Sequence, residues 1–326
     1  MSAVRIRFAA SLYDRMLALY TGEVKAQGIE LDFEPFFSPR AVFDRMTGKL
    51  EFDVAEMSMS EFMSRFTADQ CPFVAIPVFP SRAFRHGMIS INTRSGISQP
   101  SDLAGKRIGV PLYTMSAAVW IRGMLQEHFS VDLSACTWVQ GAINASGKHG
   151  DPNVLPMHKP VHIVQNETGK TLSELISLGE IDATIGTTLP EAIRTDKNVR
   201  RLFEDFKAVE KDYYERTRIF PIMHVMVIRK ELYEQHPFIA SSIYRACEES
   251  KQAALKRLRY LGAPVNMIPW LPADVDEIAD LFGGDPYPYG LDANRHTLEK
   301  FMEYLLDQSI IGKRVPIDDL FVNVDG

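Results

Sequence analysis

Two arginines and a histidine lie close together in the run Ser81-Arg82-Ala83-Phe84-Arg85-His86, directly after an apolar segment. The planar guanidinium of arginine pairs with both oxygens of a carboxylate, and the imidazole of histidine donates or accepts a proton near neutral pH. We therefore expect Arg82 or Arg85 to hold an organic anion and His86 to act as an acid or a base. The alternative is a surface salt bridge next to a histidine at a strand edge.

His224 is a second candidate for acid–base chemistry, because it interrupts an apolar strand expected over 220–228. A lone histidine in such a strand is more often a core residue with a hydrogen-bond partner than a catalytic group. A chain crossing between two lobes is expected nearby, which favours exchange of a proton with a ligand. Both interpretations stay open. We assign proton transfer to His86 and His224 as a pair, without fixing which one is the acid.

Three serines follow strand-like segments near the N-terminus. Ser11 comes after the first strand, and Ser58 and Ser60 come after the third. In open parallel sheets, ligands bind outside the carboxyl ends of the strands. These serines are therefore candidates for binding a ligand hydroxyl, and the alternative is that they cap the helices that follow.

A helix is expected to start within Tyr113-Thr-Met-Ser116, directly after a strand over 106–110. The free N–H groups and the dipole at a helix start attract anions. Tyr113, Thr114 and Ser116 are therefore predicted to contact the ligand, although Thr114 or Ser116 also suits the N-cap position. Farther along this helix, Arg122 is expected to form an ion pair.

The elements that must position these residues form two series of alternating strands and helices. The first series has strands over 4–10, 29–36 and 52–57, with helices over 13–25 and 40–48. The second has strands over 106–110, 136–140 and 161–165, a helix over 115–129, and a helix–turn–strand unit over 172–186. Alternation of this kind predicts an α/β fold with largely parallel sheets.

Two connecting segments separate these series, and we expect the chain to cross between two lobes near residues 90–95 and again near 216–222. The predicted domains are residues 1–92 with 220–326 for lobe I, and 93–219 for lobe II. This is the two-lobe architecture of type 2 periplasmic-binding-protein-like folds, in which the ligand cleft lies between the lobes.

Composition excludes several classes of protein. Lys and Arg total 36 against 42 Asp and Glu, a net charge of −6, which argues against a nucleic-acid partner. The three cysteines, Cys71, Cys136 and Cys247, have no CxxC spacing, and His149, His158 and His162 have no ligand partner at metal-site spacing, so no disulfide framework and no metal are expected. No bilayer-length apolar run and no signal-like segment is present. A cytoplasmic protein without a membrane partner is expected.

Several runs together resemble the 4,5-dihydroxyphthalate decarboxylase family, whose members have this binding-protein fold. The most specific are PSRAFRH over 80–86, IFPIMH over 219–224 and YPYGLDANR over 287–295; RIGVP over 107–111, AVWIRG over 118–123 and GEIDA over 179–183 accompany them. The resemblance covers nearly the whole chain. One departure is Thr187, which follows the strand ending at Gly186 where the family usually has a basic residue. We include Thr187 among the substrate-binding candidates.

The resemblance implies nonoxidative decarboxylation of a hydroxylated aromatic acid, 4,5-dihydroxyphthalate in the first place, to protocatechuate, with no cofactor. Arg85 would then assist His86 and His224 in catalysis. The alternative is a binding protein that holds a small aromatic anion in the same cleft without chemistry. The oligomeric state is left open, and a homo-oligomer is compatible with the sequence. The turn Pro286–Gly290, followed by Asn294, is expected to brace the C-terminal helices rather than to form an aromatic wall.

Overall fold

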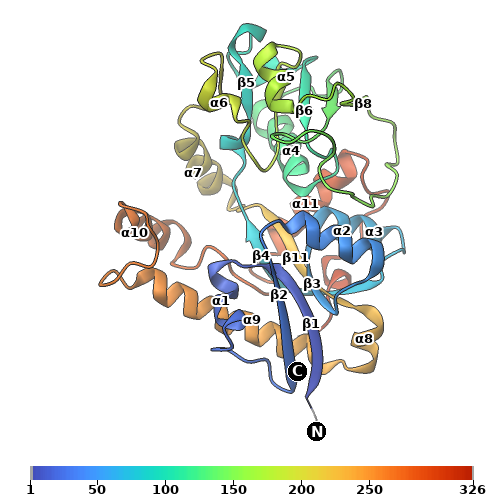
Figure 1. The fold of residues 1–326 in the computed structure, drawn as a ribbon, viewed down its shortest axis with the longest axis vertical. Coiled ribbons are helices and arrows are strands. Elements are labelled where there is room, and N and C mark those ends of the chain that lie inside the picture. The colour runs from blue at the N-terminus through green and yellow to red at the C-terminus, as the bar shows by residue number, and fades with distance from the viewer. Residues whose placement is uncertain (1–2, 325–326) are drawn as a thin grey trace. The chain divides into compact units, whose positions relative to one another are not determined.

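The computed structural model describes residues 3–324 and divides the chain into two units, each with its own sheet (Figure 1). The first unit contains the residues up to Arg82, Ile222–Glu299, and those from Val315 onward. The second contains Ala83–Pro221 and Lys300–Arg314. The α/β class expected from the sequence is confirmed.

The first unit is built on a five-stranded sheet with the order β2-β1-β3-β11-β4. Its strands are β1 (Val4–Ser11), β2 (Ile29–Phe36), β3 (Val54–Ser58), β4 (Phe73–Arg82) and β11 (Ile222–Arg229). β1 runs parallel to β2 and β3, whereas β11 runs antiparallel to β3 and β4. The inner strand β11 places His224 opposite Ser58 of β3 and Ser81 of β4, with irregular register to β4 on either side of His224.

Helices bury this sheet. They are α1 (Leu17–Tyr20), α2 (Pro39–Lys49), α3 (Met59–Thr67), α8 (Lys230–Gln235) and α9 (Phe238–Arg259). The unit also contains α10 (Leu271–Phe282), of which only Leu271 is buried, and α11 (Arg295–Asp307) begins in this unit and ends in the second. Phe8, Ile76 and Met226 of the strands form one core cluster with Ile239 and Ile243 of α9. Burial of these side chains is the main stabilising contribution to the unit, at about 1.5–3 kcal/mol each.

The second unit is built on a six-stranded sheet with the order β10-β5-β9-β6-β7-β8. The strands are β5 (Ser90–Asn92), β6 (Arg107–Val110), β7 (Thr137–Gln140), β8 (Ile163–Gln165), β9 (Ala183–Thr184) and β10 (Val199–Arg201); the helices are α4 (Ser116–Phe129), α5 (Leu172–Leu178), α6 (Ala192–Thr195) and α7 (Phe206–Thr217). β6, β7, β8 and β9 run parallel. Their carboxyl ends therefore share one edge of the sheet.

The units divide the chain differently from the predicted domains 1–92, 93–219 and 220–326. Residues 83–92, predicted in lobe I, belong to the second unit because β5 pairs with β9 and β10. Residues 300–314 also belong to the second unit, because the C-terminal half of α11 packs on α4, where Phe301 stacks on Trp120 at 5.0 Å. The chain therefore passes between the units at four places instead of two.

The prediction of one helix over residues 13–25 is wrong. The chain forms a 3₁₀ turn over Asp14–Met16 and the single turn α1, and it then reaches Gly22 in the left-handed region at φ +74°. A conformation that glycine adopts without strain ends the helix there.

Close packing of α4 against α11 leaves no room for a side chain at Gly123. A methyl group added there would overlap the Tyr304 ring. We expect Gly123→Ala to lower the free energy of unfolding by about 1–3 kcal/mol. The matched control is Gly48→Ala in α2, where the added methyl meets nothing within 4 Å. The control is expected to raise stability by about 0.5–1 kcal/mol. Urea unfolding measures both, and a stabilising Gly123→Ala would contradict the packing described.

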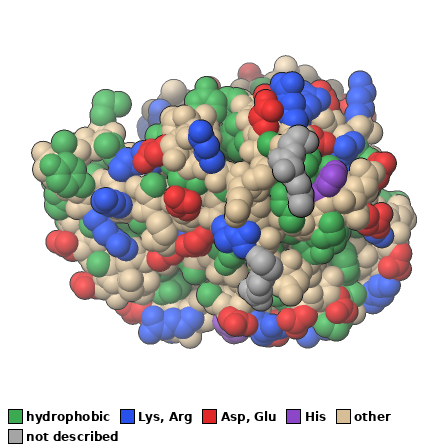
Figure 2. Space-filling model, turned by 90° about the horizontal axis from the view of Figure 1, so that it is seen from below, with side chains coloured by type: hydrophobic (Ala, Val, Ile, Leu, Met, Phe, Trp, Pro, Cys, Tyr) green, Lys and Arg blue, Asp and Glu red, His purple; other side chains and the backbone are tan. Residues whose placement is uncertain are grey.

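The surface of the described residues carries mixed charge. On the face that Figure 2 shows, Lys and Arg side chains are interspersed with Asp and Glu. Within residues 3–324, no helix has the length and apolar character needed to cross a membrane, and no three His, Cys, Asp or Glu side chains are grouped to hold a metal ion.

Candidate active site

His224 forms a buried pair with a carboxylate in the first unit. Its Nδ1 atom lies 2.5 Å from Oε1 of Glu56, which is in β3. The imidazole also makes an edge-on contact with the Phe43 ring at 4.9 Å. The side chain of His224 is 15% exposed, whereas that of Glu56 is fully buried. Only the histidine of this pair therefore reaches solvent.

Glu56 accepts three hydrogen bonds. Oε1 accepts from Tyr13 Oη at 2.7 Å as well as from His224, and Oε2 accepts from the backbone N–H of Ser11 at 2.9 Å. Burial on its own raises the pKa of the Glu56 carboxyl, but the charge and hydrogen bond of His224, with the two other donors, outweigh it and lower this pKa. Burial, followed by the charge of Glu56, raises the pKa of the Tyr13 phenol. The group is thus a carboxylate held ionised among neutral or cationic donors.

The structure brings the three candidate serines to the same end of the first sheet as His224. Ser58 lies directly across from His224 in the strand register, and its Oγ is 3.1 Å from the Oγ of Ser60. Ser58 occupies the N-cap position of α3, but its side chain does not cap the helix backbone. The Ser11 hydroxyl is buried beside Tyr13 and makes no hydrogen bond within residues 3–324. The capping alternative is therefore wrong for Ser58.

The Arg82 guanidinium holds a distant segment of the chain. Its Nη2 donates to the carbonyl of Pro288 at 3.0 Å and to Oδ1 of Asn294, and the Tyr287 hydroxyl donates to the Arg82 carbonyl at 3.1 Å. These contacts join the 286–294 segment to the end of β4. The bracing of the C-terminal helices and the role of Arg82 as a carboxylate clamp both stay predictions.

His86 and Arg85 belong to the second unit, whereas His224 belongs to the first. His86 is 1% exposed and contacts the rings of Phe203 and Tyr213 at 5.6 and 5.2 Å. Within residues 3–324, neither of its ring nitrogens makes a hydrogen bond. Burial, then the charge of His128, lowers the pKa of His86 to about 3. Arg85 is also buried and interacts electrostatically with Glu210. The assignment of proton transfer to His86 and His224 as a pair stays a prediction.

The low pKa of His86 predicts a specific loss of stability in acid. In the unfolded chain a histidine takes up a proton below about pH 6.5, whereas folded His86 remains neutral down to about pH 3. Stability is therefore complete above pH 6.5 and falls as the pH decreases towards 3, by about 2 kcal/mol between pH 7 and pH 5. In urea unfolding, the free energy of unfolding of His86→Phe should not show this loss between pH 7 and pH 5. A variant with the same pH dependence as the wild type would show that His86 is not responsible.

The second unit carries the other group of candidates, at the start of α4. The segment that joins β6 to α4 is held by the Tyr113 N–H, which donates to Oε1 of Gln140 at 2.8 Å. Met115 occupies the N-cap position and no side chain caps the helix, so neither Thr114 nor Ser116 has that role. Thr114 Oγ1 is buried and makes no hydrogen bond within residues 3–324. The helix start therefore combines the positive end of the helix dipole with a buried, unsatisfied hydroxyl, a combination that favours an anion.

Arg122 places a buried positive charge beneath this helix start. Its guanidinium lies 3.7 Å from the centre of the Tyr113 ring, its Nη2 donates to the Tyr113 carbonyl, and its Nε donates to Gln308. Burial lowers the pKa of Arg122 to about 10, with an opposing contribution from Tyr113, so the group stays charged at neutral pH. Among the described residues no carboxylate pairs with it, and its Nη1 has no hydrogen-bond partner. The prediction that Arg122 forms an ion pair is therefore wrong.

Thr187 is exposed in the segment that follows β9. The glycine before it, Gly186, packs so tightly against Pro111 that an added Cβ would lie 3.0 Å from the proline ring. Thr187 thus follows a strand whose carboxyl end shares an edge with that of β6, on the side where α4 begins. The contact of Thr187 with a ligand stays a prediction.

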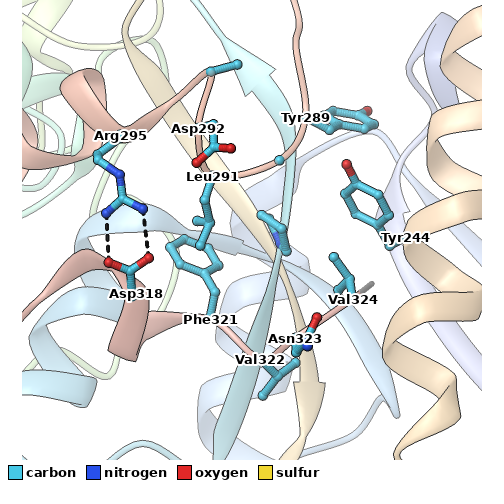
Figure 3. A pocket seen from close by; sticks show the side chains of 13 residues that line it. Tyr244, Tyr289, Leu291, Asp292, Arg295, Asp318, Phe321, Val322, Asn323 and Val324 are labelled. Carbon is cyan, nitrogen blue, oxygen red and sulfur yellow. Dashed lines mark hydrogen bonds and ion pairs between the residues drawn. The ribbon is translucent and has the colours of Figure 1, made fainter. Parts of the chain in front are cut away.

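A pocket of about 610 Å³ in the first unit contains none of the predicted site residues (Figure 3). Tyr244 and Tyr289 line one side of it, and Arg295 lies on the other. Two hydrogen bonds of 2.8 and 2.7 Å hold Arg295 to Asp318. Its cation is therefore already neutralised, and we assign the pocket no ligand.

Glu56 and Tyr13 are the site residues that sequence reasoning missed. A signal for Glu56 was present, because it is the one charged residue in the otherwise apolar and small run Val54-Ala-Glu-Met-Ser58. Buried strands exclude a carboxylate unless it has partners. Tyr13 has no comparable signal, since its role depends on the turn that replaces the expected helix.

Two solved structures show the fold that this chain shares. A putative sulfonate-binding protein SsuA from Methylobacillus flagellatus aligns with a TM-score of 0.54 at 13% identity, and the aliphatic sulphonate binding protein SsuA from Escherichia coli with 0.53 at 11%. Each alignment covers 99% of this chain and 92% of the other. This likeness defines the class of protein: a two-lobe fold of the type 2 periplasmic-binding-protein kind.

Sequence relatives define the family within this class. A 4,5-dihydroxyphthalate decarboxylase from Comamonas testosteroni is 35% identical over 98% of this chain and 97% of its own length. An enzyme of the same name from Pseudomonas putida is 34% identical over 66% of this chain and 83% of its own length. The chain belongs to the 4,5-dihydroxyphthalate decarboxylase family and is a carboxy-lyase. No family model matches it.

Proposed function

We propose that this protein catalyses the nonoxidative decarboxylation of 4,5-dihydroxyphthalate to protocatechuate and carbon dioxide, without a cofactor. Its relatives are named for this reaction. The observation that carries the proposal is His224, a partly exposed imidazole that a buried carboxylate holds at the end of the first sheet. An acid–base group is the minimum that this chemistry requires.

The reaction is a proton-for-carbon-dioxide exchange at one ring carbon. A ring hydroxyl para to the leaving carboxylate gives up its proton, and the carbon that bears the carboxylate is protonated to form a keto tautomer. The carbon–carbon bond then breaks, carbon dioxide leaves, and the electron pair of the broken bond returns to the ring to give a phenolate. The phenolate takes up a proton to become the phenol, so the net reaction consumes one proton for each carboxylate lost. The reaction involves no oxidation or reduction. Proton transfer and stabilisation of the developing charge are therefore sufficient in principle to catalyse it.

Each unit, taken by itself, carries groups that suit this chemistry. In the first unit, His224 transfers the proton, and Ser11, Ser58 and Ser60 provide hydroxyl partners beside it. In the second unit, the start of α4 with Tyr113, Thr114, Ser116 and Thr187 binds a carboxylate, and Arg122 adds its uncompensated charge. Arg122 takes the place of Arg82 and Arg85 as the source of positive charge.

A binding protein without chemistry is the second candidate, because the similar solved structures are sulfonate-binding proteins. An anion-binding helix start is all that such a function needs, and it gives His224 and Glu56 no role. The paired imidazole and carboxylate therefore favour the enzyme.

The test is an activity assay on protein dialysed against a chelator. We expect 4,5-dihydroxyphthalate to release carbon dioxide, and phthalate, which lacks the ring hydroxyls, to bind without reaction. Loss of activity on dialysis, with recovery on adding a metal ion, would contradict the cofactor-independent reaction. Tight binding of both compounds with no release would favour the binding protein.

A further inference from the structure

Resting on the proposed function, we infer that Glu56 is a positioning residue that fixes the tautomer of His224, so that in the neutral imidazole the proton lies on Nδ1 and Nε2 carries the lone pair. The pair is joined at Nδ1, which lies 2.5 Å from Oε1 of Glu56. A carboxylate oxygen only accepts, so the neutral imidazole must carry its proton on Nδ1. Nε2 makes no hydrogen bond within residues 3–324 and is left to take a proton from the ligand.

The other contacts of Glu56 make this orientation rigid. The Ser11 N–H belongs to the backbone of β1 and cannot rotate away from Oε2, and Tyr13 fixes Oε1 from a second direction. The carboxylate is fully buried, so no water competes for its lone pairs. His224 itself lies on the paired strand β11 and packs against the Phe43 ring. The imidazole therefore has one supported arrangement.

Glutamine at position 56 would reverse the tautomer without changing the shape of the side chain. The backbone N–H of Ser11 requires an acceptor, so the amide oxygen must take the Oε2 place. The amide NH₂ group then faces Tyr13 and His224. The Tyr13 hydroxyl can turn to accept, but Nδ1 accepts only if it loses its proton. The proton would move to Nε2, and the atom that should act as base would be blocked.

A histidine in the wrong tautomer is a poor catalyst even when its position is unchanged. In catalytic triads, replacing the orienting carboxylate by its amide lowers kcat by about 10⁴-fold for this reason. We expect Glu56→Gln to lower kcat by about 10²- to 10⁴-fold with little change in KM. A residue that supports only the fold would lower stability and leave kcat per folded molecule unchanged.

The direct test is ¹⁵N NMR of histidine-labelled protein at a pH where the His224 ring is neutral, with the signal assigned from its loss in His224→Asn. In the wild type, Nδ1 should carry the proton and Nε2 should not. In Glu56→Gln the two should exchange. A wild-type ring protonated on Nε2 would overturn the inference. Because this measurement needs no substrate, its result is independent of whether the protein proves to be a decarboxylase.

Kinetics on two variants complete the test. Glu61→Gln is the matched control, since Glu61 is also buried but pairs with Arg40 at 2.5 Å and does not touch His224. It should reduce stability and keep kcat within about threefold. Equal kcat losses in Glu56→Gln and Glu61→Gln would show that any buried carboxylate matters equally, and would refute a positioning role. If Glu56→Gln fails to fold, the tautomer of the wild type still decides the question.

Discussion

Replacing His224 by asparagine is expected to lower kcat by about 10²- to 10⁴-fold and to leave KM close to the wild-type value. The reason is that His224 is the imidazole that a buried carboxylate orients and that remains partly exposed. Asparagine keeps a polar group of similar size near Glu56, which limits collapse of the site. Steady-state rates of carbon dioxide release, with substrate binding measured by calorimetry, give both parameters.

The matched control for this variant is His296→Asn, because His296 is exposed near the start of α11. It should behave like the wild type. The same kcat in His224→Asn and in the control would contradict the assignment of proton transfer to His224.

Replacing Arg122 by methionine is expected to weaken phthalate binding by about 10- to 100-fold, which corresponds to about 1–3 kcal/mol. The guanidinium is charged, buried and without a carboxylate partner in the described part of the chain, so it raises the positive potential at the start of α4. Methionine fills a similar volume without charge. Removing an uncompensated buried charge is not expected to unfold the unit.

Two comparisons separate charge from shape in this prediction. Neutral catechol should bind wild type and Arg122→Met equally, because it has no carboxylate. Arg216→Met is the control protein, since Arg216 is half exposed and paired with Asp212, and solvent screens its charge. Phthalate bound equally well by all three proteins would place the anion away from α4.

Local pattern predicted the strands that are either alternating or fully apolar. β1, β2, β6 and β7 lie within a residue or two of their expected ranges. The prediction of a helix over 13–25 is wrong because the Tyr13 hydroxyl donates a hydrogen bond to Glu56 of β3, and Gly22 ends the turn that follows. Periodicity carries no information on such a contact.

The cluster of Arg82, Arg85 and His86 shows why closeness in sequence was misleading. The chain leaves the first unit directly after Arg82. Arg82 then bonds Asn294, far away in sequence, whereas His86 enters an aromatic core in the second unit. Where each side chain of such a run ends up depends on tertiary contacts that the run itself does not contain.

The central claim is that a proton replaces the carboxylate at one ring carbon and that His224 mediates this exchange. Incubating the protein with 4,5-dihydroxyphthalate in D₂O, followed by NMR and carbon dioxide analysis, tests it most directly. We predict one carbon dioxide for each substrate consumed, deuterium in protocatechuate only at the carbon that lost the carboxylate, and little product with His224→Asn. Recovery of unchanged 4,5-dihydroxyphthalate from wild-type protein that binds it would contradict the account.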